Sequence, residues 1–159
     1  MIPAEISEYK FIPTRDSQGY TNGWVIEVLK DGDQTIAYQT TVIPTADSET
    51  PIIKGWHSYH RQTNRLTCVS GFVTIKVFWD KKRLVTYKLA EHRPVMLTIP
   101  PENPFAILNY STHDFGRVIN HPQPLWESEN FKSDQYAWIP TDEQLSQNGE
   151  IIDLSEFLS

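Results

Sequence analysis

The 159-residue chain has one cysteine, no long apolar run and no basic stripe. Cys68 cannot form an internal disulfide, and its place within an apolar run predicts a small buried side chain rather than a nucleophile. Because no run approaches about 20 apolar residues, we expect no membrane-spanning helix. The N-terminus also lacks a basic-then-apolar signal pattern, so we expect a cytoplasmic protein.

The charge balance argues against a nucleic-acid partner. The net charge is −6, and the densest basic run is Lys81-Lys82-Arg83. This run follows Asp80 at an expected hairpin tip, which is typical of a solvated turn rather than a phosphate site. An anionic small ligand stays possible if its basic contacts lie inside a pocket.

Hydrophobic residues make up 39% of the chain and aromatic residues 12%, which predicts one packed domain. Eleven prolines and seven glycines, spread along the chain, suggest the many turns of an all-β protein. About eight to ten short strands predict a sandwich or a closed double-sheet barrel. We expect an N-terminal arm over 1–22, a barrel core over 23–120 and a loop-rich segment over 121–159. The main strands are expected at 23–30, 34–43, 66–70, 72–79, 83–89, 94–99, 105–110 and 115–120.

Turn signals predict how these strands are joined. The Asp-Gly pair in 31–33 predicts a hairpin between the first two strands, and Gly71 predicts another between 66–70 and 72–79. Thr141 and Gln144 have capping-box spacing, which predicts a short C-terminal helix. The segment 151–158 could be a final strand or a helical turn, and the arm could lie on the sheet or on a partner subunit.

A cluster of chemically capable side chains comes just before the strand 66–70. It contains Lys54, Trp56, His57, Tyr59, His60 and Arg61. A rigid sheet could hold these groups in fixed positions.

Four segments carry a resemblance to a known family. They are K-G-W-H at 54–57, R-Q-T-N-R-L-T-C-V-S-G at 61–71, I-P-P at 99–101 and V-I-N-H-P at 118–122. The pattern resembles the dTDP-4-dehydrorhamnose 3,5-epimerases and their relatives over roughly residues 20 to 140. The resemblance implies a cupin jelly roll, a homodimer, and an isomerase or epimerase acting on a nucleotide-linked 4-keto-6-deoxyhexose without metal or other cofactor.

The resemblance also implies roles for individual residues. His57 matches the general base, which removes the proton next to the ketone, since imidazole titrates near neutral pH. Asp134 is the match for the carboxylate that orients this histidine, and Lys54 could contact the phosphates. Arg61 and Arg65 are candidates for stabilising the enolate or the diphosphate. Further candidate substrate-binding residues are Trp56, Tyr59, His60, Asn120, His121 and Trp126.

One departure from the family pattern leaves the function open. Trp126 stands where we expect the tyrosine that donates a proton, and an indole cannot act as that acid. The chain could epimerise one carbon only, use another donor such as Tyr59, or bind a sugar nucleotide without turning it over. The alternative function is a catalytically silent cupin that binds a small carbohydrate or acts as an assembly partner.

A metal site is the third hypothesis, and the spacing argues against it. His57 and His60 are three residues apart, so on a regular strand they point to opposite faces unless a bulge intervenes. The positions where metal-binding cupins have a glutamate and a third histidine are Asn64 and Phe105 here. At most two ligands remain, fewer than a catalytic metal usually needs.

Overall fold

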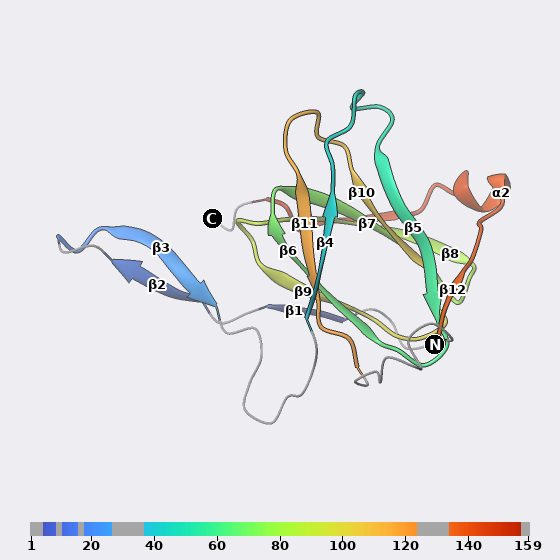
Figure 1. Ribbon diagram of the computed structural model, residues 1–159, viewed down its shortest axis with the longest axis horizontal. Helices are drawn as coiled ribbons and strands as arrows, with labels where there is room; N and C mark the ends of the chain where they lie inside the picture. Colours follow the sequence, from blue (N-terminus) through green and yellow to red (C-terminus); the bar gives the residue numbers. More distant parts are fainter. Residues whose placement is uncertain (1–4, 9–10, 16–17, 27–36, 124–133, 157–159) are drawn as a thin grey trace.

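The computed structural model describes residues 5–8, 11–15, 18–26, 37–123 and 134–156. Over these residues the chain forms two sheets that enclose an apolar core, with one short helix near the C-terminus (Figure 1). One five-stranded sheet has the order β1 (Glu5–Glu8), β9 (Val95–Ile99), β6 (Asn64–Ser70), β11 (Gly116–Asn120), β4 (Tyr38–Val42). The six-stranded sheet has the order β12 (Gln135–Ala137), β5 (Ile52–Tyr59), β10 (Phe105–Asn109), β7 (Phe72–Trp79), β8 (Arg83–Ala90), β13 (Glu150–Asp153). The predicted all-β sandwich is confirmed.

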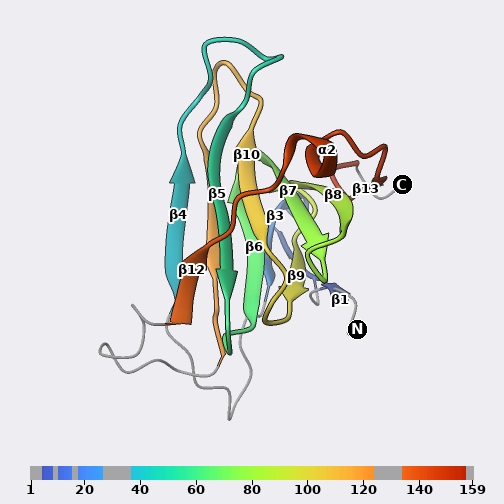
Figure 2. The same ribbon diagram turned by 90° about the vertical axis from the view of Figure 1, so that its right-hand side faces the viewer.

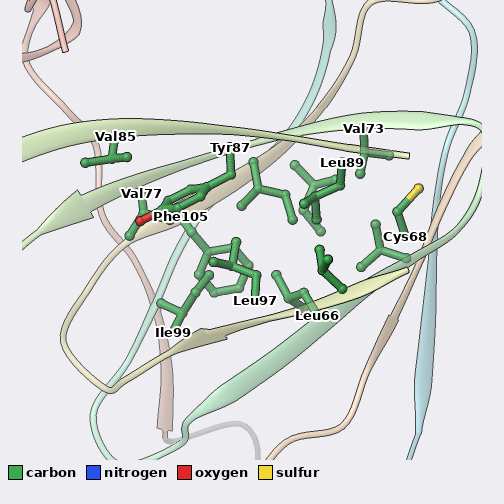
Figure 3. Close-up of a cluster of buried hydrophobic side chains, with 14 of the residues drawn as sticks. Leu66, Cys68, Val73, Val77, Val85, Tyr87, Leu89, Leu97, Ile99 and Phe105 are labelled. Atoms are coloured by element: carbon green, nitrogen blue, oxygen red, sulfur yellow. The ribbon is translucent and has the colours of Figure 1, made fainter. Parts of the chain in front are cut away.

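The core is built from the inward-facing residues of both sheets (Figure 3). Strand side chains alternate between the two faces, so every second residue of a strand enters the core. The six-stranded sheet contributes, among others, Val73, Ile75, Val77, Val85, Tyr87, Leu89, Phe105 and Ile107, and the five-stranded sheet Val42, Leu66, Cys68, Val95, Leu97, Ile99 and Val118. Cys68 is 3% exposed, and burial raises the pKa of its thiol to about 12. The prediction of a buried cysteine is confirmed.

The chain crosses from one sheet to the other at Gly71. β6 pairs with β9 and β11, whereas β7 pairs with β8 and β10, so the predicted hairpin between the strands flanking Gly71 is wrong. Both strands are apolar toward the core, and they belong to different sheets instead of sharing an edge. Gly71 has φ 72°, and a Cβ there would overlap the carbonyl oxygen of Phe115, so the crossover requires glycine.

The N-terminal strands also pair differently from the prediction. β2 (Phe11–Arg15) pairs with β3 (Thr21–Ile26) in a two-stranded sheet that projects from the sandwich (Figure 1). β4 pairs with β11, so the expected hairpin joining 23–30 to 34–43 is wrong. A local Asp-Gly signal cannot choose between strand partners, and that turn lies outside the described residues. β1 pairs with β9, which places this part of the N-terminal arm on the sheet.

The C-terminal elements cover the edges of the six-stranded sheet. The helix α2 (Asp142–Leu145) begins with the predicted capping box, in which Thr141 and Gln144 bond each other's backbone N–H groups. β13 pairs in parallel with β8, so the strand alternative for the last segment is correct. β12 lies beside β5 (Figure 2), in a region expected to be loop. No helix in the described part of the chain is long and apolar enough to span a membrane.

Candidate active site

A bulge in β5 positions the first two candidate residues. Lys54 lies opposite Ile107 and His57 opposite Phe105, so two residues of β5, Gly55 and Trp56, oppose the single Ala106 of β10. On a regular strand, side chains three residues apart face opposite sides. The extra residue in the bulge brings Lys54 and His57 to the same face.

Gly55 permits this bulge because β5 and β10 come very close there. A Cβ on Gly55 would lie 2.7 Å from the Cβ and 2.8 Å from the Cα of Ala106. Its φ of 148° is also one that residues with a side chain rarely adopt. Gly55 is thus a structural requirement of the site.

A pocket of about 340 Å³ lies between the two sheets at this bulge. Four of the predicted site residues line it: Lys54, His57, Tyr59 and Asn120. The remaining lining residues are Tyr38, Gln39, Thr40, Gln62, Leu66, Phe105, Ile107 and Gln135. Apolar side chains with a few polar groups between them are typical of small-molecule sites.

His57 is held in the pocket as a neutral imidazole. Burial lowers its pKa, and the positive charge of Lys54 lowers it further. Its Nδ1 lies 2.9 Å from Nε2 of Gln135, while its Nε2 has no hydrogen-bond partner among the described residues. An amide can present either its nitrogen or its oxygen to Nδ1, so Gln135 can support either neutral tautomer. Nε2 is therefore the nitrogen available to a ligand.

Tyr59 provides a hydroxyl whose pKa is raised, whereas the pKa of His57 is lowered. Its ring stacks on Phe105 with centroids 6.2 Å apart. Burial, together with the negative charge of Asp134, raises the pKa of Tyr59 to about 12. The pocket thus contains a histidine that is unprotonated at neutral pH and a phenol that keeps its proton.

Asp134 anchors the chain that follows β5. It is 2% exposed, and its carboxylate accepts hydrogen bonds from the backbone N–H of Arg61 (3.0 Å) and of Gln62 (3.2 Å). Its Oδ1 also lies 3.7 Å from Nε of Arg61, whose side chain is largely exposed. The hydrogen-bond partner of His57 Nδ1 is the next residue, Gln135, and not Asp134 as the family resemblance implied.

Two other predicted residues bond each other outside the pocket lining. Nε of Arg65 donates to the carbonyl oxygen of His121 (2.7 Å), and the backbone N–H of His121 donates to the carbonyl of Arg65 (2.9 Å). Burial, followed by the charge of Arg65, lowers the pKa of His121. This pair joins β6 to the end of β11.

Trp56 and His60 also point away from the pocket. Trp56 packs on Phe78, with ring centroids 5.0 Å apart, and Phe78 alternates with the core residue Val77 along β7. Trp56 therefore lies on the outer face of the sheet. His60 stacks on Tyr136 at 4.2 Å, and its Nδ1 lies 2.9 Å from Oε1 of Glu102.

The sequence also raised a possible metal site and a role for Trp126 in binding the substrate. Among the described residues, no group of three histidine, cysteine, aspartate or glutamate side chains could hold a metal ion. Trp126 lies outside the described residues.

Sequence reasoning missed the glutamines of the pocket and the contribution of β4. Gln62 and Gln135 were not singled out, because an uncharged amide carries no local signature of a site. Tyr38, Gln39 and Thr40 reach the pocket only because β4 pairs with β11. Gly55 did carry a usable signal, since a glycine within a strand pattern suggests a bulge.

Gln135→Glu is expected to raise the pKa of His57 toward or above the ordinary 6.5, since a carboxylate beside Nδ1 favours the imidazolium. An NMR titration of the His57 ring measures this directly. Gln135→Met is the control, because it removes the hydrogen bond without adding charge. Equal titration of His57 in the two variants would contradict the assigned contact.

No protein-family model matches the chain, and no curated protein sequence matches it. Solved structures, by contrast, are similar to this chain. The dTDP sugar isomerase of Desulfovibrio desulfuricans superposes with TM-score 0.66 at 16% identity, covering 91% of this chain and 89% of that one. The sugar 3,4-ketoisomerase QdtA of Thermoanaerobacterium thermosaccharolyticum, in complex with TDP, gives 0.61 at 17% identity over 88% and 89%.

A third similar structure is the epimerase RmlC of Legionella pneumophila, in complex with dTDP-4-keto-L-rhamnose. It superposes with TM-score 0.66 at 12% identity, over 94% of this chain and 82% of that one. Similarity at such low identity defines the fold. The predicted cupin jelly roll is confirmed, and the chain has the RmlC-like cupin fold found in dTDP-sugar epimerases and isomerases.

Proposed function

We propose that the chain is an epimerase or isomerase of a nucleotide-linked 4-keto-6-deoxyhexose, with His57 as the general base. The observation that carries the proposal is a neutral imidazole beside Lys54 in a pocket between the two sheets. With the amide oxygen of Gln135 accepting from Nδ1–H, Nε2 of His57 is unprotonated. It accepts the proton from the carbon next to the ketone, and the electron pair moves to the ketone oxygen as an enolate. Proton return to carbon completes the isomerisation.

The opposite pKa shifts of His57 and Tyr59 support this assignment. A base must be unprotonated before the reaction, and an acid must hold its proton, so enzymes place such groups in environments that move their pKa values apart. Burial lowers the pKa of His57 and raises that of Tyr59 to about 12. Tyr59 is therefore our candidate for the proton donor.

Lys54 supplies the positive charge that the reaction requires. Its side chain lines the same pocket and is near enough to lower the pKa of His57. A fixed cation stabilises negative charge as it develops on an enolate oxygen, or it binds the diphosphate of the substrate. The fold comparisons support this substrate class, since the QdtA and RmlC structures contain TDP and a dTDP-sugar.

A thermal-shift panel of nucleotides, nucleotide sugars and divalent metals tests the substrate class. A ligand that binds only the folded state raises the Tm, and we expect this from thymidine or uridine diphosphate sugars. Lys54→Met should weaken that binding by about ten-fold, the order expected for a charged contact. Lys82→Met, at the exposed tip of the β7–β8 hairpin, is the matched control.

The other outcomes point to the alternatives. A response to metals alone would replace the proposal with a metal-dependent cupin. Silence from every nucleotide would favour a cupin that binds another small carbohydrate or a protein partner. Equal binding by Lys54→Met and Lys82→Met would remove Lys54 from the site.

A further inference from the structure

An unpaired acceptor lies in the wall of the pocket. Gln62 is 1% exposed and lines the pocket, yet its Oε1 has no hydrogen-bond partner among the described residues. A buried polar atom without a partner costs free energy, and such atoms are uncommon in folded proteins. A ligand in the pocket can supply the missing donor.

Hydrogen bonds among the side-chain amides of Gln62, Asn64 and Asn120 determine which atom of the Gln62 amide is left without a partner. The backbone N–H of Arg65 donates to Oδ1 of Asn120 (3.0 Å), and a backbone N–H can only donate. Nδ2 of Asn120 must then donate to Oδ1 of Asn64 (2.8 Å). Nε2 of Gln62 donates to the same oxygen (2.7 Å), which leaves Oε1 as its free end.

The position of Gln62 is fixed from its backbone as well. Its N–H donates to Oδ2 of the buried Asp134 (3.2 Å), and the neighbouring Arg61 N–H donates to Oδ1 (3.0 Å). The oxygen of Gln62 is therefore a preorganised acceptor, because the backbone N–H and the Nε2 of the same residue are both held by hydrogen bonds.

We propose that Gln62 is a specificity-determining residue whose Oε1 accepts a hydrogen bond from a ring hydroxyl of the sugar. This inference rests on the proposed function and names the part of the substrate that this wall recognises. A nucleotide-linked 4-keto-6-deoxyhexose keeps free ring hydroxyls, whereas the diphosphate and a ketone oxygen carry no proton to donate. The acceptor thus distinguishes the hydroxylated sugar from the diphosphate and the ketone, whereas contact with a donor of the nucleoside would weaken dTDP and dTDP-glucose binding alike.

The test compares the binding of dTDP-glucose and dTDP by calorimetry. Gln62→Met removes the acceptor at similar volume, and we expect it to weaken dTDP-glucose binding by about ten-fold while leaving dTDP binding unchanged. Gln123→Met is the matched control, because Gln123 is exposed and lies outside the pocket lining. An equal loss for both ligands, or no loss for either, would overturn the inference and leave the proposed function standing.

A ligand series makes the test independent of the variant's folding. Among dTDP-glucose analogues that each lack one ring hydroxyl, we expect one to bind the unmodified protein about ten-fold more weakly than the parent. That analogue should lose no further affinity in Gln62→Met, since the contact is already gone. If every analogue binds as tightly as dTDP-glucose, the inference fails. If the unmodified protein binds neither dTDP nor dTDP-glucose, the proposed function fails and this inference fails with it.

Discussion

His57→Ala is expected to slow solvent deuterium uptake next to the ketone by about 10²- to 10⁴-fold, the usual contribution of a general base. The physical reason is that burial and the charge of Lys54 lower the pKa of His57, so its imidazole is unprotonated near neutral pH and can accept a proton. Exchange is measured by NMR on a dTDP-4-keto-6-deoxyhexose in D₂O. Because His57 is only partly buried, we expect a loss of about 1 kcal/mol or less in the free energy of unfolding.

Two comparisons make the result specific to His57. His113→Ala, in the exposed turn between β10 and β11, should exchange at the unmodified rate. The pH profile should also fall on the acid side, since protonating His57 removes the base, and burial and Lys54 place that limb below the ordinary pKa of 6.5. Full exchange in a folded His57→Ala protein would exclude His57 as the base.

Gly55→Ala is expected to disable the site and weaken the fold together. The new Cβ would lie 2.7 Å from the Cβ of Ala106, so β5 must shift or the bulge must be lost. Loss of the bulge would turn His57 or Lys54 out of the pocket. We expect about 1–3 kcal/mol less stability in urea unfolding, with loss of dTDP-sugar binding.

Matched glycine variants separate the steric contact from the backbone conformation. Gly19 also has a positive φ, of 86°, but a Cβ there meets nothing within 4 Å, so Gly19→Ala should cost less than Gly55→Ala. Combining Gly55→Ala with Ala106→Gly removes the Cβ–Cβ contact and should restore part of the stability. Unchanged stability and binding in Gly55→Ala would show that the site does not depend on the close approach at this bulge.

The strands could be predicted from sequence, but not all of their partners. Alternation correctly located β8, and runs of β-forming residues between turn signals correctly located β7, β9, β10 and β11. Partner choice depends on contacts between distant residues. The crossover at Gly71 and the pairing of β4 with β11 therefore had no reliable local signal.

The same limit applies to the candidate site. Lys54, His57, Tyr59 and Asn120 were singled out from sequence, and all four line the pocket. Trp56 and His60 were grouped with them because they are close in sequence, but strand geometry directs them elsewhere. Gln62 and Gln135 could be recognised as site residues only from their hydrogen bonds and their burial in the structure.

Deuterium exchange by the unmodified protein tests the central claim most directly. The protein is incubated in D₂O with dTDP-4-keto-6-deoxyglucose, and the proton on the ring carbon next to the ketone is followed by NMR. We predict that its signal disappears much faster than in the protein-free sample, because His57 removes this proton and solvent deuterium replaces it. A ligand that binds in the pocket but keeps this proton at the uncatalysed rate would contradict the account and identify the protein as a silent sugar-nucleotide binder.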